Sequence, residues 1–115
     1  MGNTLWILEE EQESDNWDHS EIIKNIKDLD TITTKLGFSK LISYFDESIW
    51  AKEFGMEIEA KYFDVYPIEK LILVLIDEVK KKSNNRFLID EMEDILSKCI
   101  LAKEKNVKIR LALVP

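Results

Sequence analysis

The sequence predicts an α+β fold, in which a small mixed or antiparallel sheet of about three strands packs against three to four helices. Short apolar runs near the two ends of the chain, residues 4–8 and 107–114, have the length and composition of strands. Between them, apolar residues recur at the spacing of an amphipathic helix in several separate stretches. Because both terminal runs are strongly apolar, we expect the first and last strands to be neighbours in the centre of the sheet.

All residues, 1–115, are expected to form a single domain, because this length is near the usual size of one domain and no linker or repeat divides the chain. Hydrophobic residues make up 45% of the chain, which is enough for a core without disulfides. The start, MGNTLWILEEE, lacks the features of a signal peptide, and the longest apolar run, residues 71–76, is too short to cross a bilayer. The sequence therefore indicates a soluble cytoplasmic protein with no membrane contact.

The N-terminal half is expected to continue from the first strand into an acidic loop and then a helix. Residues 20–37 have apolar residues near helical spacing and end at a glycine. Asp18 fits the N-cap of this helix because Glu21 follows three residues later, as in a capping box, and Ser20 is the alternative N-cap.

The middle of the chain gives a weaker pattern. Residues 39–48 predict a second short helix with Ser39 as its N-cap, and the following residues can form one helical turn or two. Residues 56–62, MEIEAKY, alternate apolar and charged side chains, which predicts an exposed strand between two loops.

The C-terminal half predicts two long helices and the last strand. Residues 67–82 place Pro67 in a first helical turn and end in lysines that match the helix dipole. Residues 83–85, Ser-Asn-Asn, end this helix and can cap the next, residues 87–106. The second helix has one apolar face, and its opposite face carries Glu91, Asp94, Lys98 and Lys105.

The charge of the chain is negative and uneven. The net charge is −7, and residues 1–66 carry 15 acidic and 6 basic residues, while residues 67–115 carry 8 acidic and 10 basic ones. Such a surface repels nucleic acid, whose binding depends on neutralising phosphates with lysine and arginine. It favours a basic protein as the partner.

Residues that carry most catalytic chemistry are few. His19 is the single histidine and is expected to be solvated at a helix start, and Cys99, the single cysteine, is expected to be a buried thiol. The acids of the loop lack the turn glycine and closing glutamate of an EF-hand, and no glycine-rich phosphate loop occurs. We therefore expect a protein that is not an enzyme and that binds no metal and no other cofactor.

The segment EEEQESDNWDHS, residues 9–20, holds six carboxylates and no lysine or arginine. Residues 9–18 are interpreted as a mobile anionic rim for a partner, and a solvated loop without a partner is the alternative. Trp17 and Trp50 can either fold back as anchors of their loops or act as interface hot spots, where tryptophan is enriched. The candidate partner-binding residues are Glu9, Glu10, Glu11, Glu13, Asp15, Trp17, Asp18, Asp46, Glu47, Trp50 and Glu53.

The chain resembles bacterial immunity proteins, the partners of polymorphic toxins that include those of contact-dependent growth inhibition. It is small and acidic, and its opening MGNTLWIL, its helix start WDHS and its ending VKIRLALVP are similar to parts of small bacterial proteins of this length. The resemblance covers the whole chain in outline and assigns no functional residue to a position.

This resemblance implies a non-enzymatic immunity protein that binds a cognate toxin domain one to one and blocks its active site or substrate path. A toxin with a basic cleft, such as a nuclease, would be met by carboxylates in place of substrate phosphates. The alternative is a structural or regulatory adaptor, in the form of a homodimer joined through an exposed edge of the 56–62 strand. The expected state is a monomer or a small homo-oligomer.

Overall fold

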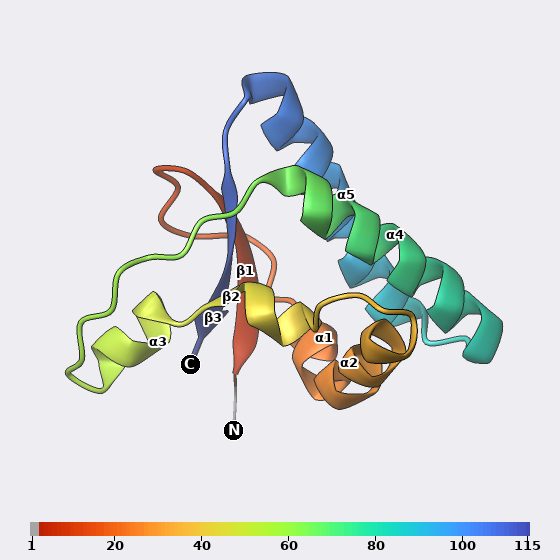
Figure 1. Cartoon of the computed structure of the whole chain (residues 1–115). Helices are drawn as coiled ribbons and strands as arrows, with labels where there is room; N and C mark the ends of the chain where they lie inside the picture. The colour runs from red at the N-terminus through yellow and green to blue at the C-terminus, as the bar shows by residue number, and fades with distance from the viewer. Residues whose placement is uncertain (1–2) are drawn as a thin grey trace.

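The predicted α+β fold is confirmed by the computed structural model, which describes residues 3–115 (Figure 1). Its sheet has three strands in the order β1-β3-β2, and β3 is therefore the central strand. The strand bounds are Thr4–Glu9 for β1, Phe45–Asp46 for β2 and Ile109–Val114 for β3. The structure has five α-helices and one 3-10 helix in the described residues: α1 (Ser20–Lys24), α2 (Ile26–Lys35), η1 (Leu41–Tyr44), α3 (Ser48–Glu53), α4 (Val65–Lys82) and α5 (Arg86–Lys105).

The sheet is mixed, because β1 runs antiparallel to β3 and β2 runs parallel to it. Ile7 lies opposite Leu111 in the antiparallel pair, and Phe45 lies opposite the same Leu111 in the parallel pair. The expectation that the first and last strands are neighbours is confirmed, but only the last strand is central. The two-residue strand β2 was not predicted, since so short a segment has no pattern of its own.

The two faces of the sheet have different coverings. Leu5, Ile7 and Leu111 face the main core, which they share with α4 and α5. These two long helices pack side by side on this face, whereas α3 packs against β3 from the other side (Figure 1). Because side chains alternate along a strand, Leu8 and its cross-strand neighbour Arg110 point to the second face. The second face therefore carries the sheet's one arginine.

The predicted helix over residues 20–37 is two helices, α1 and α2, with a break at Asn25. The side chain of Asn25 donates a hydrogen bond of 2.8 Å to the carbonyl of Glu21, and its backbone lies outside the helical region at φ −106°, ψ 12°. Asparagine competes for backbone groups in this way, which is why it favours helix ends over helix interiors.

Neither predicted N-cap of the first helix is used. No side chain near His19, the residue at the N-cap position, caps α1. Glu91 of α5 instead accepts hydrogen bonds from the N–H groups of Glu21 and Ile22, at 3.1 and 3.0 Å. The carboxylate of Asp18 is 2.7 Å from the indole nitrogen of Trp6, which accounts for its absence from the cap.

The short helix after residue 39 also has a remote cap. Ser39 is not its N-cap, because η1 begins at Leu41 and Lys40 holds that position without a side-chain bond. The carboxylate of Asp30, on α2, accepts the N–H of Leu41 at 2.7 Å. A distant acid again takes the place of the local residue that the sequence predicts.

The predicted strand over residues 56–62 is wrong, because these residues form no strand. The edge of β3 that such a strand would need is already paired with β2 at Leu111 and Ala112 and with Phe63 at Ile109. The preceding residues form α3, which corresponds to the open alternative of one or two helical turns. Residues 54–62 therefore run outside the sheet, and the chain returns to it at Phe63.

The predicted C-terminal half is confirmed. Pro67 lies in the first turn of α4, and the side chain of Asn85 caps α5 by accepting the N–H of Leu88 at 3.2 Å. Asn106 ends α5 in the left-handed conformation, at φ 57° and ψ 46°, which asparagine tolerates better than most residues. Among the described residues, no helix combines the length and apolar character needed to cross a membrane.

Candidate functional site

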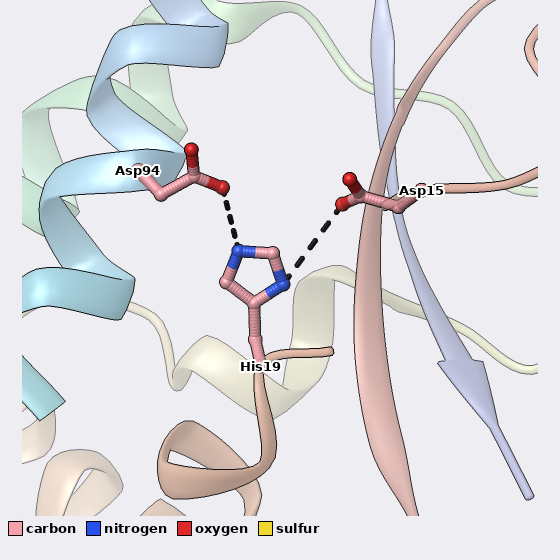
Figure 2. Close-up of side chains that lie close together, drawn as sticks. All are labelled: Asp15, His19 and Asp94. Atoms are coloured by element: carbon pink, nitrogen blue, oxygen red, sulfur yellow. Dashed lines mark hydrogen bonds and ion pairs between the residues drawn. The ribbon is translucent and has the colours of Figure 1, made fainter. Parts of the chain in front are cut away.

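A cluster of four ionisable side chains, two of them buried and two partly buried, lies where the acidic segment meets α5. Asp15 and His19 come from the segment before α1, and Asp94 and Lys98 lie one turn apart on α5. His19 sits between the two carboxylates, with its ring nitrogens pointing toward Asp94 on one side and Asp15 on the other (Figure 2). Lys98 contacts both acids, at 2.7 Å from Asp15 and 3.0 Å from Asp94. Two carboxylates, one imidazole and one ammonium group are thus collected in one place.

His19 is fully buried, so the expectation of a solvated histidine is wrong. Its Nδ1 lies 2.8 Å from the carbonyl oxygen of Leu5, and its Nε2 lies 2.7 Å from a carboxylate oxygen of Asp94. Its backbone N–H bonds the same Leu5 carbonyl at 3.0 Å. Both ring nitrogens of His19 therefore face oxygen atoms of neighbouring groups.

Asp15 points inward, and its side chain is only 1% exposed. It accepts hydrogen bonds from the N–H of Ile7 at 3.0 Å and from Lys98 at 2.7 and 2.8 Å. Burial alone raises the pKa of Asp15, but the Lys98 ammonium, the Ile7 N–H and the nearby His19 together hold that pKa below its ordinary value. Asp15 is therefore an ionised internal anchor, which differs from the surface rim that the sequence predicts.

The three groups Asp15, His19 and Asp94 place ligand atoms within 4.8 Å of one another, as a metal site would require. Two features count against a metal at this position. The ammonium of Lys98 already lies against both carboxylates. The 2.7 Å between His19 and Asp94 is also shorter than the roughly 3.3 Å that separates two ligands of a tetrahedral zinc ion. The cluster is a closed hydrogen-bonded ion network.

This network closes the outer edge of β1. In the order β1-β3-β2, one side of β1 has no strand neighbour. On that side the carbonyl of Leu5 is bonded by His19, and the N–H of Ile7 is bonded by Asp15. Unpaired edge groups invite pairing with other chains. The position of the acidic segment directly after β1 is thereby explained, because it folds back to satisfy its own strand.

The other acids of this segment remain on the surface. Glu10, Glu11 and Glu13 are exposed, as is Asp18. Glu9 is partly buried and forms an ion pair of 2.9 Å with Lys105. The segment therefore divides into one internal acid and several external ones.

Trp17 combines the two alternatives that the sequence left open. Its ring stacks on His19, with 5.2 Å between ring centroids, and 40% of the residue is still exposed. It thus folds back over the network and presents an aromatic surface beside the external acids.

The second candidate segment, residues 46–53, also divides into internal and external acids. Asp46 is 1% exposed and accepts from the N–H groups of Ser48 and Lys61, at 3.2 and 3.1 Å. Glu47 and Glu53 are exposed, and Trp50 is half-buried against Phe54, with 4.6 Å between ring centroids. Asp46, like Asp15, is an internal anchor.

Arg110 brings the two candidate segments together on the second face of the sheet. Its guanidinium lies 3.3 Å from the carboxylate of Asp46 and donates to the backbone carbonyl of Gln12, also at 3.3 Å. Residues 9–18 and 46–53, far apart in the sequence, therefore meet at one side chain of the central strand.

Four residues that hold these segments were not predicted as site residues from the sequence: Glu91, Asp94, Lys98 and Arg110. The first three were expected on the charged face of their helix, but Glu91 is 5% exposed and that face packs against the acidic segment and α1. Burial raises the pKa of Glu91, and the hydrogen bonds that it accepts from the N–H groups of Ile22 and Glu21 offset part of this rise. A signal for Arg110 existed, since it interrupts an otherwise apolar strand.

The expectation of a buried thiol is confirmed, because Cys99 is fully buried and burial raises its pKa to about 12.

No protein-family model matches the chain, and no curated protein or solved structure matches it either.

Proposed function

We propose that this protein is an immunity protein, which binds a basic toxin domain through the external acids of residues 10–18 and blocks it without performing chemistry. The observation that carries the proposal is the division of this segment, in which Asp15 is held inside while Glu10, Glu11 and Glu13 face solvent. The uneven net charge and the resemblance to immunity proteins support the same function.

Charge complementarity is the first physical support. Opposite charges steer two proteins together and raise association rates to roughly 10⁸–10⁹ M⁻¹s⁻¹ at low salt. Three neighbouring glutamates without a basic residue between them suit a cleft that is lined with lysine and arginine.

The attachment of the segment is the second support. A partner that binds a disordered loop must bear the entropy of ordering it, whereas a segment already fixed avoids that cost. Hydrogen bonds at Asp15, Asp18 and His19 fix the end of this segment before any partner arrives. Trp17 adds an exposed aromatic surface of the kind enriched at binding hot spots.

Growth rescue tests the proposal. The product of the gene adjacent to the one for this chain is expressed in a bacterial host, alone and together with this chain, and growth is compared. The association rate of the two purified proteins is then measured by stopped flow. We expect rescue by the wild-type chain. The triple variant Glu10→Lys, Glu11→Lys, Glu13→Lys is expected to associate at least about tenfold more slowly, because electrostatic steering is reversed locally.

The matched control reverses three solvent-facing acids elsewhere: Asp28→Lys, Asp77→Lys and Asp90→Lys. This triple variant has the same net charge but keeps the acidic segment, so its association rate should stay within about threefold of wild type. Equal slowing of both variants would assign the effect to net charge and reject residues 10–18 as the docking surface. Absence of both rescue and binding by the wild-type chain would reject the immunity function.

A further inference from the structure

Residues 54–62 form an extended excursion between α3 and α4 (Figure 1), and within residues 3–115 their N–H groups are hydrogen-bonded only near the two ends of the excursion. The N–H of Met56 bonds the carbonyl of Ala51, and the N–H of Lys61 bonds the carboxylate of Asp46. Between them, the N–H groups of residues 57–60 donate to no other group within residues 3–115. This stretch has the alternating sequence of a strand and lacks the neighbour that would make it one.

An open groove of about 590 Å³ runs along this excursion. It is lined by residues 56–60, by Ser48, Ile49 and Lys52 of α3, and by Arg110 of β3. The groove is therefore bordered by the unpaired backbone groups and by a helix. The acidic segment lies nearby, because Arg110 also contacts Gln12.

The side chains of the excursion define the chemistry of an occupant. Glu57 and Glu59 of the excursion line the groove, and its one basic residue, Lys61, donates a hydrogen bond of 2.8 Å to the carbonyl of Ser43. The apolar residues of the excursion are unusually exposed: Phe54 by 62%, Met56 by 48% and Ile58 by 50%. A segment that alternates basic and apolar side chains would complement both kinds of residue.

We propose that an extended, basic segment of a partner protein adds along residues 57–60 as a strand, with its lysines or arginines against Glu57 and Glu59 and its apolar side chains against Met56 and Ile58. Strand addition of this kind draws affinity from main-chain hydrogen bonds and specificity from alternate side chains. The inference rests on the proposed function in one respect, because the same basic partner supplies the segment.

A second copy of this chain complements the excursion less well. In an antiparallel pair centred on Ile58, Glu57 of one copy would oppose Glu59 of the other. In the pair centred on Glu59, that residue would oppose its own equivalent. Like charges directly opposite each other destabilise a strand pair. A basic segment meets no such repulsion.

The test uses the full chain and a labelled peptide, acetyl-Lys-Val-Lys-Ile-Lys-Val-amide, and measures binding by fluorescence anisotropy. Two further peptides serve as controls: one with glutamate in place of lysine, and one with the lysines and apolar residues grouped in two blocks. We expect the alternating basic peptide to bind, the acidic peptide not to bind and the block peptide to bind more weakly. On binding, the amide protons of residues 57–60 should become protected from exchange with solvent.

The chain variants are Glu57→Lys with Glu59→Lys, and the control Asp28→Lys with Asp77→Lys. All four residues are exposed, so both variants should fold, which circular dichroism checks. We expect the first variant to bind the alternating peptide about tenfold more weakly and the control at most about twofold more weakly. Equal weakening in both, or no binding of the peptide up to about 1 mM, overturns the inference.

Three other outcomes separate this inference from its alternatives. If sedimentation shows that the wild-type chain is a dimer and the Glu57→Lys, Glu59→Lys variant is a monomer, a second copy is the occupant and the inference is overturned. If the peptide binds as expected while growth rescue fails, the inference stands and the immunity function falls. If rescue and toxin binding persist unchanged in that variant and the peptide does not bind, the immunity function stands alone.

Discussion

Residues 10–19 and 54–62 are both acidic and both lie outside the helices and strands, yet they are attached to the rest of the molecule in different ways. The first segment is tied to β1 and α5 through Asp15 and His19, whose side chains are buried. The second is tied to the body at its ends, near Met56 and Lys61, and exposes its apolar residues between them. Both present glutamates to solvent.

The difference shows that acidic composition alone does not set the role of a segment. In the first segment, the carboxylate of Asp15 pairs with Lys98 inside the molecule, while the neighbouring glutamates face solvent. In residues 54–62, Glu57 and Glu59 have no cationic partner within residues 3–115, and the N–H groups of residues 57–60 donate to no acceptor there. The first segment offers a fixed surface, and the second offers a site that a partner can complete.

Breaking the buried network should produce the largest effect. Asp15→Ala leaves Lys98 and His19 without their shared anion and leaves the N–H of Ile7 unpaired, so we expect a loss of about 3–5 kcal/mol in the free energy of unfolding. Urea denaturation followed by circular dichroism measures it. Glu59→Ala, the matched change in the second segment, should stay within about 0.5 kcal/mol of wild type. Similar losses in the two variants would remove the contrast between the segments.

The remote cap of α1 should rank second. Glu91→Ala removes the acceptor of two N–H groups, those of Glu21 and Ile22, and should lower the free energy of unfolding by about 2–3 kcal/mol. Asp18→Ala is the comparison, because the sequence assigns the cap to Asp18 and the structure does not. A larger loss in Asp18→Ala than in Glu91→Ala would contradict the remote cap.

Acid should weaken the first segment before it affects the second. The pKa of Asp15 lies below its ordinary value of 3.8, so its ionised form is favoured by folding. Its contribution to stability is therefore complete above about pH 4 and is lost as the pH falls through the lowered pKa. Glu91 acts in the opposite sense, since its raised pKa lets protonation favour the folded state. Unfolding of wild type and Asp15→Asn between pH 2 and 6 should show a steeper acid loss in wild type.

Hydrogen exchange should register the smallest energetic difference. We expect the amides of residues 57–60 to exchange close to the rate of an unfolded chain, because they donate to no acceptor within residues 3–115. The amide of Ile7, bonded to Asp15, should exchange far more slowly. Slow exchange at residues 57–60 in the free protein would mean that their backbone groups are already satisfied.

The sequence predicted the elements whose pattern is local, and the structure departs from it where distant residues decide. The helices α4 and α5 have strong apolar periodicity and, in Asn85, a local cap that is used. The caps of α1 and η1 come from Glu91 and Asp30, which no rule about neighbouring residues can identify. The pattern at residues 56–62 is truly that of a strand, but the edge it needed belongs to other residues.

The sequence was sufficient to predict which acidic residues belong to the candidate site, but not which of them are buried. Sequence alone could point to the acids at residues 9–18 and to Trp17, because their spacing and charge are visible. It could not tell that Asp15 turns inward, because that depends on Lys98, which lies 83 residues away. Asp46 turns inward for the same reason, through Arg110, 64 residues away.

β3 is the strand with which both β1 and β2 pair, so no pair of strands in the sheet can form without residues 109–114. During synthesis, β1 leaves the ribosome first and remains without its neighbour while more than 100 further residues are added. The helical layer can collapse earlier, since contacts close in sequence form faster than distant ones. The three-stranded sheet can therefore be completed only after residues 109–114 are available to pair with both β1 and β2.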